Sequence, residues 1–409
     1  MSKVKAILLS LLLPLSAAAQ EQDTISNGQS KGKFQEFMDE FRLVQQYLDS
    51  SAKAKVDSRY ITIPEKPWRV IIRDRVNTVD VDYSSRIVAP KEEDGYMNWN
   101  MCFSPPRGAS LGAWVGYRGM GFGFAKSLSK NAGRFISVST TGAKFGFNFR
   151  YRKFETTSAS FSAQSYSEGE EENWEEEINI LQPAVIRSFY VNGYYVLNNR
   201  RYSQAAAYNL ATIQRRSAGS FLLGATWYSS SFDYAGKDNS GIMLMGGNTG
   251  RMQLQQVNIC VGYGFNIVPF RNFVINLMAM PNMSIYNRVK VTKYDSNFKL
   301  FGSDDEIDDY GKWNSATRTW ENGKTHKPFT LIIEGEENWA AEAELWKIGY
   351  ETEYSAFQFN LDLRAGMSYN FSDFCIGFQM QFNNYFYKKD YNKVELTDGY
   401  AMLSIGVRL

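Results

Sequence analysis

The sequence contains one histidine and three cysteines among its 409 residues. A single histidine, His326, cannot form an H-E-x-x-H zinc site, and its stretch GKTHKPF predicts an ordinary loop. Cys102, Cys260 and Cys375 are too few, and odd in number, for a disulfide framework in a chain of this length. The sequence therefore predicts no catalytic residue, no metal ligand and no bound cofactor.

Long apolar runs and a strong net charge are also missing. After the first twenty residues, no stretch reaches the roughly 18 to 20 consecutive apolar residues that a membrane-spanning helix needs. The formal net charge of +2 argues against a nucleic-acid partner. A mean hydropathy of -0.38 with 44% hydrophobic residues is too polar for a helical membrane protein. If the mature chain enters a membrane, it does so as strands.

The first twenty residues have the three parts of a secretory signal peptide. Two lysines precede an apolar run over residues 6–15, and small residues occupy positions 16–19. This layout predicts a signal peptide over residues 1–19, with cleavage after Ala19 and export of the chain. No cysteine lies near the cut, so the signal offers no site for a lipid anchor.

The stretch KFGFNFRYR at 144–152 places an aromatic residue at every second position. Successive side chains of an extended chain point to opposite faces, so one face is apolar and the other polar and cationic. The same alternation runs without exception over residues 357–371, which is longer than a typical soluble strand and suits a tilted membrane strand. If the apolar face meets lipid, seven polar residues of these patterned strands are candidates for the interior: Lys144, Asn148, Arg150, Arg152, Asp362, Arg364 and Arg408.

The two-faced pattern recurs along the chain and predicts about 12 antiparallel strands, with a range of 10 to 14. The expected strands run in one direction from near residues 66, 109, 142, 218, 271 and 373, and in the opposite direction from near residues 79, 120, 184, 253, 354 and 398. An even number fits a single-chain barrel with both ends in the periplasm. Short turns at 268–272 and 371–373 would then lie inside, and the long acidic connections at 167–177 and 293–352 outside.

Before the strands, apolar residues recur at three- and four-residue steps over residues 34–48. This period predicts one amphipathic helix within a periplasmic leader over residues 20–63, followed by the barrel over residues 64–409. The helix docks on the protein, is partly frayed in the periplasm, or plugs the barrel.

Two further sequence features have simpler structural explanations than chemistry. Glycine-rich pieces at 116–123 and 262–266 lack the strand-then-helix context of a phosphate loop, and they predict room for crowded side chains in the lumen. Acidic clusters at 168–177 and 304–309 do not match a calcium loop, and they predict a solvated rim that could bridge through divalent cations.

Three segments carry a resemblance to a known family: DSRYITIPEKPWRV at 57–70, SLGAWVGYRGMGFGF at 110–124, and RRYSQAAAYNLATIQRRSAGSFLLG at 200–224. They resemble the Bacteroidetes family called domain of unknown function 4421, over about Asp57 to Leu409. The resemblance implies an outer-membrane β-barrel-like protein with no established activity, and it transfers no site residue.

The sequence thus predicts an all-β transmembrane antiparallel barrel in the outer membrane of a Gram-negative bacterium. Its expected partners are outer-membrane lipids, lipopolysaccharide and the barrel-assembly machinery, since the final strand ends on an apolar residue, as insertion signals do. A narrow or plugged channel, or a barrel that binds small solutes or lipids, is the expected role, with an excess of positive charge inside. A lipid-modifying outer-membrane enzyme and a soluble periplasmic β protein are the alternatives. The oligomeric state is left open.

Overall fold

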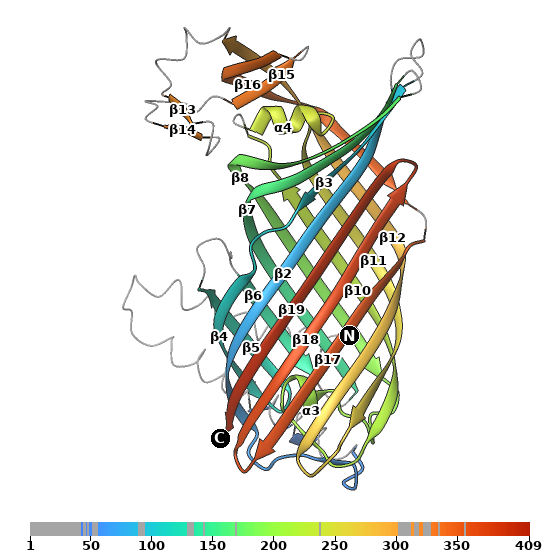
Figure 1. Ribbon diagram of the computed structural model, residues 1–409. Helices are drawn as coiled ribbons and strands as arrows, with labels where there is room; N and C mark the ends of the chain where they lie inside the picture. Colours follow the sequence, from blue (N-terminus) through green and yellow to red (C-terminus); the bar gives the residue numbers. More distant parts are fainter. Residues whose placement is uncertain are drawn as a thin grey trace, which may run out of the picture.

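The computed structural model shows an elongated β-barrel (Figure 1). At one end, several strands extend beyond the rest of the barrel wall (Figure 1). It describes residues 42, 43, 46, 49, 50, 56–88, 95–128, 135–141, 144–167, 170–236, 239–301, 312–314, 319–321, 329–333, 336–355 and 357–409. Twelve strands form a closed ring in which each pairs antiparallel with the next and the last pairs with the first. The predicted barrel of about 12 strands is confirmed.

The ring strands are, in order, β2 (Trp68–Val88), β4 (Gly108–Tyr117), β5 (Met120–Ser127), β6 (Phe135–Thr141), β7 (Phe145–Ser167), β8 (Glu170–Val196), β10 (Ala218–Asp233), β11 (Thr249–Ile267), β12 (Phe273–Phe301), β17 (Phe359–Phe371), β18 (Phe374–Lys389) and β19 (Asn392–Arg408). Above β17, β12 pairs instead with β16 (Glu336–Tyr354), which also pairs with β15 (Phe329–Ile333). A separate two-stranded pair joins β13 (Lys312–Asn314) and β14 (Thr319–Glu321).

The wall between β2 and β7 has two levels. At the level of residues 68–77, β2 pairs with β4, and the short β5–β6 hairpin completes the wall to β7. At the upper level, β3 (Gly95–Phe103) bridges β2 directly to β7. The ring therefore holds fewer strands at that level.

Three predicted strands were wrong. No separate strand begins near residue 79, and the strands near 109 and 120 run in the direction opposite to the predicted one. β2 runs unbroken through residue 79, and β6, which the sequence analysis missed, restores the even number. As a result β4 runs opposite to β2, and β5 parallel to it. Around Asn77 both faces of β2 carry polar residues, because the apolar residues move from the outward face to the inward face there. In the sequence this change resembles the end of a strand.

The two ends of the barrel differ. Short turns follow β4, β11 and β17 at one end, which we call the turn end and where the C-terminus also lies (Figure 1). The opposite loop end holds the extended β7–β8 hairpin, β16 and helix α4 (Ser240–Met245) (Figure 1). The expected asymmetry of short turns and long loops has exceptions. The long connection over residues 197–217 lies at the turn end, and the two-residue turn between β18 and β19 lies at the loop end.

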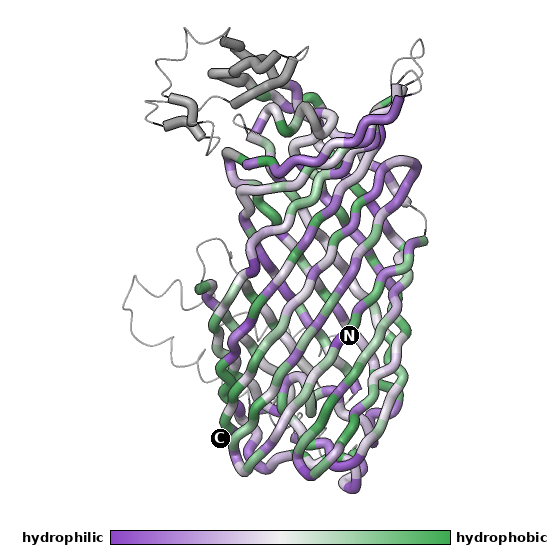
Figure 2. Tube along the Cα trace, in the orientation of Figure 1, coloured by the Kyte–Doolittle hydropathy of each residue, from purple (hydrophilic) through white to green (hydrophobic). Residues whose placement is uncertain are grey.

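The apolar face of the wall changes sides along the strands. Toward the turn end the outward residues are apolar, such as Phe221, Leu277 and Ile405, and the inward ones polar. Toward the loop end β2 instead buries Val79 and Val81 inside the barrel and carries aspartates outside. Figure 2 shows the hydrophobic colour concentrated in the lower wall and the hydrophilic colour in the upper strands. The lower half therefore has the surface of a membrane-spanning barrel, and the upper half that of a β protein in water.

The predicted leader helix lies mostly outside the described residues. Its described members Arg42, Leu43 and Gln46 are helical, as are Asp49 and Ser50. In the described ranges, no helix is long and apolar enough to cross a membrane.

Candidate functional site

The lumen at the turn end is filled by the connection between β8 and β10, residues 197–217, which we call the plug. It contains helix α3 (Ala205–Tyr208) and strand β9 (Ile213–Gln214) and lies within the lower barrel in Figure 1. Tyr202, Ala206 and Leu210 of the plug are fully buried. In the sequence this block stands out only by its family resemblance, because its turn of helix is too short to show a period.

Hydrogen bonds from the barrel wall hold the plug by its backbone. Side-chain N–H and O–H groups of the wall donate to carbonyl oxygens along the plug, including those left without helical partners at the end of α3. The pairs are Asn266 to Ser203 at 2.9 Å, Ser368 to Ala206 at 2.8 Å, Gln379 to Tyr208, Arg69 to Asn209 at 2.7 Å and Arg408 to Leu210 at 3.2 Å. Polar inward side chains thus serve as a cradle for one inserted segment.

Leu210 carries backbone strain at the end of α3. Its φ is +60°, in the left-handed region that a leucine rarely adopts. The side chain packs in a buried cluster with Ile71, Trp114 and Cys375. Strain of this kind persists only where the surroundings over-determine the conformation. The packing of Leu210 therefore closes the plug over Cys375.

The residues just before the barrel tie the two arms of the plug together. Strand β1 (Ile61–Thr62) pairs with β9, although it falls within the predicted leader. The buried Gln214 amide donates to the carbonyls of Arg201 and Arg216 at 2.6 and 2.9 Å. The guanidinium groups of both arginines lie over the Tyr60 ring, at 5.2 and 6.0 Å. The plug is therefore clamped from below as well as held from the wall.

The leader also contacts the rim of the turn end. The Asp49 carboxylate accepts a hydrogen bond from the Tyr117 hydroxyl at 2.8 Å and pairs with the Arg118 guanidinium at 2.6 Å. These contacts fasten the helix to the β4–β5 turn. They place it at the mouth of the barrel, whereas the plug inside the lumen is made by residues 197–217.

Above the plug, a charged network crosses the lumen. The Arg364 guanidinium binds Asp362 through two nitrogens, at 2.6 and 3.1 Å, and donates to the Tyr190 hydroxyl at 2.9 Å. A second buried ion pair joins Arg152 to Asp398. Because both pairs are almost fully buried, each charge depends on its partner for stabilisation.

The seven predicted interior residues fall in different places. Arg150, Arg152, Asp362, Arg364 and Arg408 are all buried, with exposed fractions from 2 to 8%. Of these, Arg152, Asp362 and Arg364 belong to the charged network. The Arg150 guanidinium lies 4.0 Å from the Tyr190 ring, and Arg408 holds the plug. Asn148 is half-buried beside Asn192, and Lys144 is half-buried in the bend before β7.

Positive charge is in excess within the described part of the lumen. Six buried arginines stand against two buried aspartates, an excess of four. The predicted inventory missed Arg69 and Arg75 on β2, and it missed Asp398 on β19. The period-two alternation along β2 and β19 places these three residues on the inward face, so the sequence pattern does mark them. Burying a charge is costly unless a counter-charge or hydrogen bonds compensate it.

Arginines of β2 stack on aromatic rings of the lumen. The Arg69 and Arg73 guanidinium groups lie 5.3 and 5.0 Å from the Trp114 ring, and that of Arg75 lies 4.8 Å from the Tyr400 ring. Such stacking partly stabilises a cation that is removed from water.

The glycine-rich piece at 116–123 makes room for the Trp114 indole. A Cβ at Gly116 would lie 1.9 Å from the indole, and one at Gly121 would lie 2.1 Å from it. The prediction that these glycines accommodate a crowded lumen is confirmed.

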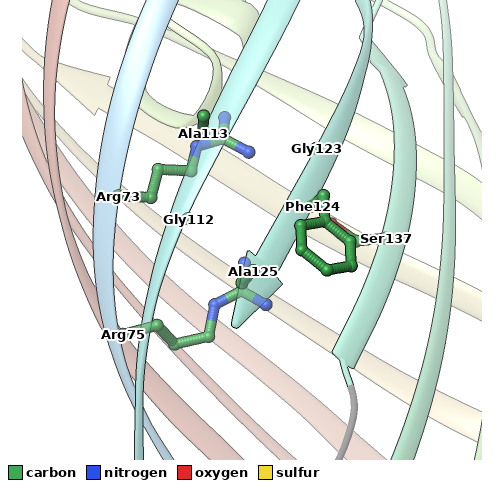
Figure 3. Close-up of a pocket in the computed structure, with 8 residues that line it drawn as sticks. All are labelled: Arg73, Arg75, Gly112, Ala113, Gly123, Phe124, Ala125 and Ser137. Carbon is green, nitrogen blue, oxygen red and sulfur yellow. The ribbon is translucent and has the colours of Figure 1, made fainter. Parts of the chain in front are cut away.

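A small cavity lies beside these arginines, against the wall of β4, β5 and β6 (Figure 3). Arg73 and Arg75 reach across it from β2, and its far side consists of small residues and one phenylalanine (Figure 3). The lining residues are Arg73, Arg75, Gly112, Ala113, Gly123, Phe124, Ala125 and Ser137. No carboxylate belongs to this lining.

The loop-end half of the lumen is apolar. Inward side chains from most of the strands form one buried cluster, which includes Val81, Trp99, Phe161 and Tyr387, and Ile242 of α4 closes it from above. Burial raises the pKa of the Tyr83 hydroxyl to about 12. This half is packed like the core of a β protein, so it does not continue the polar lumen below it.

Two features singled out in the sequence remain apart from the site. His326 and the acidic cluster at 304–309 lie outside the described residues. Glu170, Glu171 and Glu172 are exposed on β8. Within the ranges that the structure describes, no three His, Cys, Asp or Glu side chains are grouped to hold a metal ion.

A closed antiparallel ring with an apolar outer belt and a polar lower lumen defines the class of transmembrane β-barrels. The chain belongs to the family described as Domain of unknown function (DUF4421), whose model matches residues 55–408. The predicted family is confirmed.

Comparison with solved structures finds barrels at very low identity. The outer membrane protease OmpT from Escherichia coli shares 7% identity, with a TM-score of 0.37 and coverage of 85% of this chain and 98% of that one. The translocator domain of autotransporter NalP from Neisseria meningitidis shares 8%, with a TM-score of 0.29 and coverage of 92% and 98%. The Pseudomonas putida toluene transporter TodX shares 9%, with a TM-score of 0.20 and coverage of 85% and 90%. No curated protein matches the chain in sequence.

Proposed function

We propose that the protein is a closed outer-membrane barrel that binds ligands or partners and does not serve as an open diffusion pore. The plug carries this proposal. It fills the lumen at the turn end, it is held by five wall side chains, and Gln214 and Tyr60 clamp its arms. The apolar cluster beneath α4 fills the other end. A diffusion pore needs a continuous polar path through the lumen. The plug at one end and the apolar cluster at the other would interrupt such a path.

The outer membrane of a Gram-negative bacterium is the proposed location. The lower wall presents exposed apolar side chains on all sides, as a lipid-facing belt does, while the upper wall is polar. The short turns then face the periplasm and the loop end faces outward. Membrane lipids, including lipopolysaccharide, would contact the belt, and the barrel-assembly machinery would insert the chain. The signal peptide over residues 1–19 remains a prediction.

Planar-bilayer recording of the purified protein tests the closed lumen. We expect silence at either polarity, because both ends of the lumen are filled. A variant in which a short glycine-serine turn replaces residues 200–213 opens the turn end alone, and we expect it to show at most a small, anion-preferring conductance. Large steps from the unmodified protein, or a cation-selective current from the variant, would contradict the proposal.

We also propose that the protein is not an enzyme. The rival is a lipid-modifying hydrolase, which needs a base beside a nucleophile within reach of lipid. The two buried aspartates are each engaged by an arginine, which does not suit a free general base. Lipid A and phospholipid profiles of a deletion strain are expected to match those of the parent. Loss of one modified lipid species, restored by the gene, would establish an enzyme instead.

A further inference from the structure

The cavity of Figure 3 places two guanidinium groups over a wall of small side chains. Gly112 and Gly123 have no side chain, and Ala125 and Ser137 have short ones, so the wall leaves the space open. A Cβ at Gly112 would lie 2.6 Å from the Phe124 carbonyl, which shows how closely β4 and β5 approach here. The space is a property of the backbone and not of one movable side chain.

Arg73 faces this space without a polar partner. Among the described residues, no hydrogen bond or ion pair reaches its guanidinium, and its Nε is buried without an acceptor. Its guanidinium lies 5.0 Å from the centre of the Trp114 ring, which attracts a cation but accepts no conventional hydrogen bond. Arg73 as a whole is half-buried, and its buried Nε–H group is costly to leave without an acceptor.

The surroundings of the cavity add positive charge. Arg75 lies within electrostatic reach of Arg73, Arg150 and Arg152. The buried carboxylates of the described lumen, Asp398 and Asp362, are already bound to Arg152 and Arg364. In the part of the chain that the structure describes, the cavity is therefore lined by cations, and both buried carboxylates of the lumen are already bound to other arginines.

We propose that this cavity is a binding site for one small inorganic anion of about halide size. The space open to the centre of a water-sized solute is about 10 Å³, which suits one water molecule or one small ion and excludes a sugar or a nucleotide. Arg73, Arg75 and Ser137 line the cavity, and in this proposal their N–H and O–H groups donate to the anion; the lining contributes no competing negative charge. This inference goes beyond the closed-barrel proposal, because it assigns a class of ligand, a small anion, to the lumen.

Bromide is the probe for this site. Crystals of the full protein grown or soaked in bromide are expected to show an anomalous peak between Arg73, Arg75 and Ser137. In solution, replacing gluconate by bromide at constant ionic strength is expected to raise the thermal midpoint of the wild type.

Two variants separate charge from space. Arg73→Gln removes one cation and is expected to weaken bromide binding about tenfold, as the loss of one charge-assisted hydrogen bond does. Ala125→Val fills the cavity while both arginines remain, and it is expected to abolish the peak. Arg107→Gln, at an exposed arginine between β3 and β4, is the matched control and is expected to bind as the wild type does.

Three outcomes would overturn the proposal: no bromide peak in the wild type, water alone in the cavity, or unchanged binding by both variants. If Arg73→Gln fails to fold, the wild-type crystals and Ala125→Val still decide. The result is also independent of the conductance test. An open pore in bilayers would refute the closed barrel and leave the bromide peak to be judged separately.

Discussion

Cys102 is the cysteine of the described chain that faces outward, on β3 in the loop-end half. Burial, together with the neighbouring Asp82 carboxylate, raises the pKa of its thiol to about 11. Only the thiolate reacts with maleimides, so at pH 8 we expect labelling on the order of a hundredfold slower than for a free cysteine. The rate should rise up to about pH 11.

Asp82→Asn isolates the contribution of the carboxylate to that pKa. Removing a negative charge beside the thiol favours the thiolate, so the pKa falls and labelling at pH 8 becomes faster. Cys102→Ser gives the background from Cys260 and Cys375, which are buried in the lumen. Equal rates for the wild type and Asp82→Asn would show that the carboxylate does not act on the thiol.

The buried pair of Arg152 and Asp398 gives a stability prediction at the same scale. Asp398→Asn leaves a buried guanidinium without its counter-charge, and we expect it to lower the free energy of unfolding by about 3–5 kcal/mol. Urea titration in lipid vesicles measures this change. Asp390→Asn, in the exposed β18–β19 turn with a φ of 49° that asparagine tolerates, is the control and should cost less than about 0.5 kcal/mol. Similar losses for the two variants would be incompatible with a structural role for the pair.

At the scale of elements, the plug is the part of the fold with the clearest test. Leu210→Ala keeps the strained backbone but removes the packing over Cys375, and a leucine-to-alanine change in a core typically costs about 2–5 kcal/mol. We expect a small methanethiosulfonate reagent to modify Cys375 in this variant and not in the wild type, in a Cys102→Ser background. Mass spectrometry locates the modified residue.

Cys260 provides the internal control for that experiment. It packs near Tyr202, Leu222 and Met280, away from Leu210, so local loosening leaves it protected. Modification of both cysteines would mean that the whole plug leaves the lumen. Protection of Cys375 in Leu210→Ala would show that the plug stays closed without this contact. Leu128→Ala, at an exposed leucine, should behave as the wild type does.

For the whole molecule, the reversal of the apolar face sets where the membrane ends. Leu363 points outward from β17 in the middle of the apolar belt, whereas Thr397 points outward from β19 in the polar upper wall. Leu363→Arg should destabilise the protein in lipid by about 2–4 kcal/mol, as arginine does on the lipid face of a barrel. Thr397→Arg should change the free energy of unfolding by less than about 0.5 kcal/mol. Equal effects, measured by unfolding in vesicles, would place the membrane boundary elsewhere.

The sequence by itself determined the barrel, its approximate strand number and the polar character of the turn-end half of its interior. These follow from period-two alternation, a local property: each residue of β17 shows its face through its immediate neighbours. The inward direction of Arg150, Arg364 and Arg408 depends on the same alternation.

Only the tertiary structure decided the course of β2, the place of β6 and the use of the lumen. β2 continues through Asn77 because β3 and β19 supply its partners above that point, and no local signal marks such pairing. Residues 197–217 form a plug because Arg69, Arg408 and Ser368, which are far away in sequence, bind their carbonyl groups. The cavity beside Arg73 likewise exists only where four strands bring small residues opposite two cations. Contacts between distant residues decide these features, and a linear pattern carries no record of them.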